Sequence, residues 1–160
     1  MCEVRRARLD AAAGHGRLGR LEEALAHLDA VGGRKPNDPA ILCELGRVYV
    51  ALGRFDEGLE IYARARAVAP NHADAHHLAG AASLRRGDVG GAITAYRRAL
   101  QLQPQRISVA NNLAWILATS TDATLRDGAE AVRWAEHAAK LRGRKHIDVL
   151  DALGAAYAEV

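Results

Sequence analysis

Apolar side chains recur along this chain at intervals of three and four residues, in segments separated by short polar turns that contain glycine. This spacing gathers the apolar side chains on one stripe of an α-helix. The segments 39–52 and 55–68 therefore predict two amphipathic helices joined by a short turn. The expected stripes consist of Leu42, Leu45, Val48, Tyr49 and Leu52 in the first helix, and of Phe55, Leu59, Tyr62 and Val68 in the second.

Local signals mark where these helices begin and end. Asp38 followed by Pro39 predicts an N-cap with proline in the first turn. Gly53 suits a helix end that needs a positive φ, and Pro70 stops the second helix. The sequence thus predicts a complete helical hairpin between Asp38 and Pro70.

The hairpin pattern repeats with a period of 34 residues. Three sets of similar residues each recur at this interval, which indicates an internal repeat and not chance. We expect units at residues 5–38, 39–72, 73–106 and 107–146, followed by a segment 147–160 that starts another first helix. The columns are Pro36, Pro70 and Pro104; Gly19, Gly53 and Gly87; and Ala24, Gly58 and Ala92.

Residue size and spacing in the second unit resemble the tetratricopeptide repeat. The resemblance implies an all-α fold, a right-handed superhelical solenoid of antiparallel helix pairs, here a single array over residues 1–160 with about four repeats and a terminal helix. The first unit is degenerate, and the fourth resembles a variant repeat of bacterial tetratricopeptide proteins. The matching residues are Leu42, Leu45, Gly46, Tyr49, Gly53, Gly58, Tyr62, Ala65 and Pro70.

Small residues recur inside the helices, where a glycine costs about 1 kcal/mol relative to alanine. Retaining glycine at such places predicts two helix backbones that approach too closely for a larger side chain. The positions are Gly46, Gly80, Ala114 and Gly154 in first helices and Ala24, Gly58, Ala92 and Ala131 in second helices.

The fourth unit departs from the period, because 39 residues separate Ala92 from Ala131. The extra five residues are expected between its two helices, with Asp127 and Glu130 forming a capping box. The insertion is interpreted either as a tolerated surface turn or as a contact loop at the edge of the groove. The segment 147–160 either caps the array or belongs to a longer protein, and self-association through this helix, at Leu150, is a further hypothesis.

Composition excludes several classes of protein. The net charge is +3, and the arginines and lysines are spread along the chain, which does not favour a nucleic-acid surface. Apolar runs are too short for a membrane helix. The two cysteines, Cys2 and Cys43, have no CxxC spacing, and MCEVRRAR has no secretion-signal pattern, so a cytoplasmic location is expected.

The family resemblance implies a concave groove, lined by the first helices, that takes an extended peptide or a partner helix. Trp and Arg are common at binding hot spots, which favours Arg47 and Trp115, although Trp115 could instead pack on the neighbouring repeat. The predicted partner-binding residues are Arg47, His77, Arg85, Asn111 and Trp115. The other groove positions are Leu9, Ala13, Cys43, Val50, Asp74, Ala81, Leu84, Ser108 and Thr119.

Other chemistry is not indicated. Leu9 and Ala13 replace the residues of the family's carboxylate clamp, and the asparagine ladder is limited to Asn112. His72, His76 and His77 form the histidine cluster, and His72 and His76 could share one helical face, but the spacing fixes no acidic third ligand. Neither a metal nor a cofactor is therefore predicted. No catalytic motif is present, and an enzyme is not expected. The sequence therefore predicts either an adaptor that binds a protein segment, or a regulatory or substrate-presenting module of a larger protein.

Overall fold

A computed structural model describes residues 37–142 and 154–158, together with Glu23 and Ala26. These residues contain helices and no strand. The helices are α2 (Pro39–Ala51), α3 (Phe55–Val68), α4 (Ala73–Arg86), α5 (Val89–Leu102), α6 (Ile107–Thr119) and α7 (Gly128–Arg142), with a short 3-10 helix, η1 (Ala123–Leu125), before α7.

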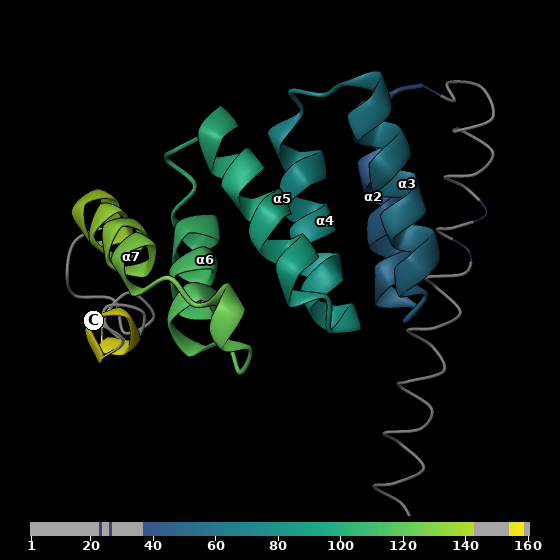
Figure 1. Ribbon diagram of the computed structural model, residues 1–160. Helices are drawn as coiled ribbons and strands as arrows, with labels where there is room; N and C mark the ends of the chain where they lie inside the picture. Colours follow the sequence, from purple (N-terminus) through teal and green to yellow (C-terminus); the bar gives the residue numbers. More distant parts are fainter. Residues whose placement is uncertain (1–22, 24–25, 27–36, 143–153, 159–160) are drawn as a thin grey trace, which may run out of the picture.

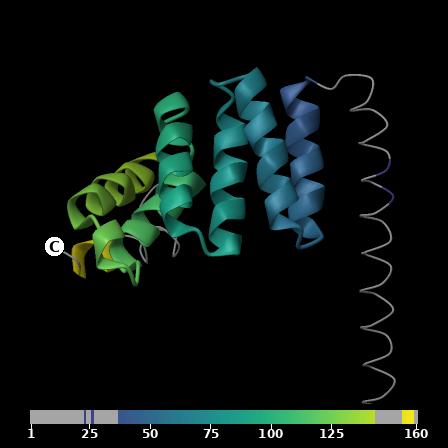
Figure 2. The same cartoon turned by 45° about the vertical axis from the view of Figure 1, so that its right-hand side comes forward.

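The helices form three hairpins stacked side by side, from α2 and α3 to α6 and α7 (Figures 1 and 2). Within each hairpin the two helices pack on each other, and α3 packs on α4 as α5 does on α6. The first helices α2 and α4 also contact each other directly. The predicted all-α solenoid of helix pairs is confirmed over the described residues.

The predicted helix ends are found in the structure. The Asp38 carboxylate accepts hydrogen bonds from the backbone N–H groups of Ala40 and Ile41, with Pro39 in the first turn. Gly53 and Gly87 have φ values of 80° and 89°, a region that favours glycine. The expectation for Val68 was wrong: this residue is the last of α3, where the helix ends, and it is 45% exposed.

The close approach predicted at the small residues involves the helix backbone at Gly58, where a Cβ would lie 3.2 Å from the backbone oxygen of Gly46, but tyrosine rings at Gly46 and Gly80. A Cβ built on Gly80 would lie 2.6 Å from two ring atoms of Tyr96, and a Cβ on Gly46 would overlap the ring of Tyr62. Both tyrosines are almost completely buried. The glycines of the first helices therefore leave room for an aromatic side chain from the second helix of the same hairpin.

The longer turn of the fourth unit lies where the sequence predicted it, between α6 and α7. Asp127 caps α7 by accepting from the Glu130 N–H at 2.8 Å. The reciprocal half of the predicted capping box is wrong, because the Glu130 carboxylate pairs with Arg97 of α5 and accepts from the Trp134 indole. Leu125 of η1 packs against the core, so part of the inserted turn is anchored.

Residues 154–158 lie beside the last hairpin (Figure 1), where Ala156 is fully buried in the core cluster that contains Leu113 and Leu117. Only Glu23, Ala26, Asn37 and Asp38 of the unit at 5–38 are described, and Leu9, Ala13 and Leu150 lie outside the described residues. In the described part of the chain, no helix is long and apolar enough to cross a membrane.

Candidate functional site

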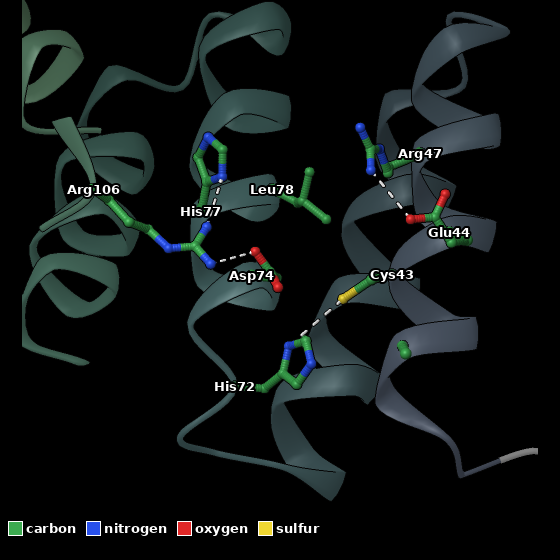
Figure 3. Close-up of a pocket in the computed structure, with 9 residues that line it drawn as sticks. Cys43, Glu44, Arg47, His72, Asp74, His77, Leu78 and Arg106 are labelled. Carbon is green, nitrogen blue, oxygen red and sulfur yellow. Dashed lines mark hydrogen bonds and ion pairs between the residues drawn. The ribbon is translucent and has the colours of Figure 1, made fainter. Parts of the chain in front are cut away.

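The first helices of two neighbouring hairpins enclose a pocket of about 370 Å³ between α2 and α4 (Figure 3). Its two walls come from units two and three, and the turn before α6 closes one end. Repeats that stack in this way present corresponding faces of successive helices side by side. The lining residues are Ala40, Cys43, Glu44, Arg47, His72, Asp74, His77, Leu78 and Arg106.

The α2 wall carries an exposed cation. The Nη1 atom of Arg47 donates to the Glu44 carboxylate at 3.1 Å, one turn earlier on the same helix. Both side chains are 59% exposed. Such a surface pair contributes at most about 1 kcal/mol, so the Arg47 guanidinium can exchange Glu44 for an incoming acceptor at little cost.

The α4 wall is held by an arginine from the next repeat. Arg106 makes no cap hydrogen bond at the start of α6, and its side chain extends back over α4 instead. Its Nη2 atom lies 2.5 Å from a carboxylate oxygen of Asp74, and its Nη1 atom lies 3.4 Å from His77 Nδ1. Its Nε atom donates to the Gln103 side chain. Three contacts therefore fix the guanidinium at this end of the pocket.

The remaining lining residues, Cys43, His72 and Leu78, form a mainly apolar part of the pocket without a reactive group. Burial raises the pKa of the Cys43 thiol to about 11, so the side chain is a neutral thiol and not a nucleophile at neutral pH. His72 Nδ1 accepts from the backbone N–H of Ala75 at 3.3 Å, which caps α4, and lies 4.0 Å from the Cys43 sulfur. Leu78 completes this part of the pocket.

The charges around the pocket balance while the histidines are neutral. Arg47 and Arg106 supply two positive charges, and Glu44 and Asp74 supply two negative charges. Burial, followed by the nearby Arg106 guanidinium, lowers the pKa of His77 below its usual range, so His77 is neutral at pH 7. The pocket thus offers both donors and acceptors next to its mainly apolar part.

The structure brings together two of the five predicted partner-binding residues, Arg47 and His77. Arg85 lies outside the pocket, with its guanidinium 5.0 Å from the centre of the Phe55 ring. Trp115 is 48% exposed on α6, whereas Asn111 is only 7% exposed and so offers little surface to a partner.

Sequence reasoning did not select Arg106, His72 or Glu44. Asp38, His72 and Arg106 share one column of the 34-residue period, the position immediately before a first helix. Each side chain therefore starts beside the groove end of its helix. The repeat position that they share could therefore have identified His72 and Arg106, the two residues of this column that line the pocket.

The histidine cluster of the sequence is dispersed in space. His72 caps α4, whereas His76 Nε2 bonds to the carbonyl oxygen of Pro70 at 2.8 Å and His77 contacts Arg106. Across the described ranges, no group of three or more His, Cys, Asp and Glu side chains is placed to hold a metal ion. Each histidine instead has its own protein contact.

Comparison with known proteins agrees with this architecture. Residues 43–107 match the model of the tetratricopeptide repeat. Two crystal structures of the protein MamA each align with 88% of this chain at a TM-score of 0.74 and 20% identity, over 74% and 78% of their own length. No curated protein sequence matches the chain.

A further structure, described as the first tetratricopeptide repeat domain of Spaghetti (RPAP3) bound to the HSP90 peptide SRMEEVD, aligns with 75% of this chain and 90% of its own. The TM-score is 0.64 at 17% identity, a likeness of fold. Together these comparisons confirm the resemblance seen in the sequence: residues 43–107 match the tetratricopeptide-repeat family, and the chain has the fold of a tetratricopeptide-repeat array.

Proposed function

We propose that this chain is a binding module that holds an extended segment of a partner protein along its first helices, with the pocket between α2 and α4 as the anchoring point. One observation carries the proposal. The Arg47 guanidinium and the Asp74 carboxylate line the same pocket, together with the apolar Leu78 and the uncharged Cys43 (Figure 3). A donor and an acceptor on opposite walls suit the alternating C=O and N–H groups of a peptide.

The size of the pocket supports this role. A volume of about 370 Å³ lies near the lower end of the range for ligand sites, about 300–1,000 Å³. It admits a side chain with its adjoining main chain, but not a folded domain. A longer segment must therefore continue outside the pocket.

The repeat supplies that continuation. Arg47, Ala81 and Trp115 are 34 residues apart and occupy the same position on α2, α4 and α6. The exposed Trp115 ring gives a segment leaving the pocket a large apolar contact surface. The peptide held by the similar RPAP3 domain is an example of such binding on this fold. The proposed role is binding alone, without catalysis.

The proposal is tested by selecting peptides from a random library displayed on phage against the whole chain, and then measuring their affinity. Arg47→Glu should weaken the best peptide at least tenfold, because it removes the exposed donor and places a carboxylate opposite Asp74. Trp115→Ala should weaken the same peptide further.

Arg64→Glu is the matched control, since it makes the same charge change on the exposed face of α3, away from the pocket. Circular dichroism would establish that all three variants remain folded. Equal loss of affinity in Arg47→Glu and Arg64→Glu would mean that only overall charge matters. Unchanged affinity in Arg47→Glu would reject the pocket as the anchoring point.

A further inference from the structure

One end of the pocket contains a contact that depends on the protonation of a histidine. Arginine has only donor N–H groups, so the contact between Arg106 Nη1 and His77 Nδ1 at 3.4 Å requires an unprotonated Nδ1. A proton on this atom would face the guanidinium cation directly. Protonation of His77 therefore removes this contact.

A second partner for the protonated ring is already in place. Asp74 precedes His77 by three residues on α4, and side chains at this spacing are neighbours on a helix. The Asp74 side chain is 53% exposed, so solvent and not packed protein covers much of it. The ring itself is half-buried beside Tyr96, at 6.2 Å between ring centres. The carboxylate is thus the group that moves.

The groups facing His77 come from four parts of the fold. Asp74 lies on its own helix, Arg106 in the turn before α6, Arg47 on α2, and the uncharged Tyr96 ring on α5. Burial, Arg106 and Arg47 disfavour the protonated ring, while Asp74 favours it. An additional negative charge in the pocket would favour the protonated ring and so raise the pKa of His77.

We propose that His77 is a proton-operated switch: its protonation draws Asp74 away from Arg106, and the released Arg106 guanidinium then binds an acidic side chain of the partner segment. The inference rests on the proposed binding function and adds its regulation. The charge of the lining changes from balanced to net positive as the pH falls. Acidic segments therefore bind more tightly below the usual pKa range of histidine, about 6.5.

Binding and protonation are reciprocal. A bound carboxylate raises the pKa of His77, so the complex takes up a proton when it forms near pH 6. Glutamate side chains, with a usual pKa of about 4.3, remain ionised over this range. The pH dependence then reports on the protein and not on the peptide.

The test uses two capped peptides of the same length, Ac-GSEAESG-NH2 and its glutamine counterpart Ac-GSQAQSG-NH2, titrated into the whole chain and followed by NMR at pH 7.5 and pH 5.5. The glutamate peptide should bind about three- to fivefold more tightly at pH 5.5, the range that one exposed charge contact supplies. The glutamine peptide should show no such change.

Two variants separate this switch from the other pocket histidine. His77→Gln keeps an acceptor for Arg106 at every pH, and it should bind the glutamate peptide equally at both pH values. His72→Asn keeps the cap of α4, because asparagine is also a good N-cap, and its pH dependence should match that of the wild type.

Equal tightening in His77→Gln would overturn the inference, as would identical behaviour of the two peptides. In the latter case the proposed binding function would stand if both peptides shift the signals of α2 and α4. If neither peptide binds at millimolar concentration at either pH, the inference fails, while peptides selected from the library still test the binding function separately.

Discussion

Each buried tyrosine of the second helices lies over a glycine of the first helix in the same hairpin. Tyr62 covers Gly46, and Tyr96 covers Gly80. In the fourth unit the corresponding residues are Ala114 and Ala135, both fully buried in one core cluster. The fourth unit therefore has a small residue at both places and does not repeat the contact of a tyrosine ring with a glycine. The sequence showed the small residues but could not show that a ring and not a backbone fills the space beside Gly46 and Gly80.

Gly80→Ala should destabilise the chain by about 1–3 kcal/mol, the usual cost of overpacking a core. The new methyl group would lie 2.6 Å from the Tyr96 ring, which is too deeply buried to move aside. Urea denaturation would measure the free energy of unfolding.

Gly90→Ala is the control for helix propensity, because its nearest neighbour would be a methyl group of Leu125 at 3.9 Å. It should leave stability unchanged or raise it by up to about 1 kcal/mol. If both alanines have the same effect, the tight fit at Gly80 does not govern packing.

At the scale of the elements, an ion pair holds α7 in position behind the longest turn in the described part of the chain. The Arg97 guanidinium of α5 donates to both carboxylate oxygens of Glu130 on α7, and the Trp134 indole donates to one of them. The sequence predicted Glu130 as half of a capping box, because the local spacing suggested it. The true partner lies 33 residues away in the chain, a distance over which spacing carries no information about pairing.

Glu130→Gln should lower the free energy of unfolding at pH 7 by about 1–2 kcal/mol, since the hydrogen bonds to a charged acceptor are replaced by weaker ones. Burial opposes ionisation of Glu130, but the bonds from Arg97 and Trp134 prevail and lower its pKa. A lowered pKa stabilises the fold above the usual value of about 4.3 for an unfolded glutamate.

This stabilisation is lost as the pH falls through the lower pKa of the folded state. The stability difference between wild type and Glu130→Gln should therefore shrink in denaturation experiments below about pH 4. A difference that stays constant down to pH 3 would show that the carboxylate charge does not contribute.

For the whole molecule, the 34-residue period predicted the hairpins, their order and their turns, because each unit must bury its apolar stripe on the next. The resemblance to the tetratricopeptide repeat predicted Arg47 and His77 at the groove, and both line the pocket between α2 and α4. It did not show that Arg106 reaches back over α4, since that depends on the conformation of a single side chain in a turn. It also did not distinguish the buried Asn111 from the exposed Trp115, four residues apart on α6.

The central claim is that partner segments bind between α2 and α4. Amide chemical-shift changes in the isotopically labelled chain, on addition of a peptide selected against it, test this claim most directly. We predict the largest changes at residues 40–47 and 74–78, with smaller ones around Trp115. Changes concentrated instead on the second helices α3 and α5 would contradict the claim and place the binding surface on the other layer of the solenoid.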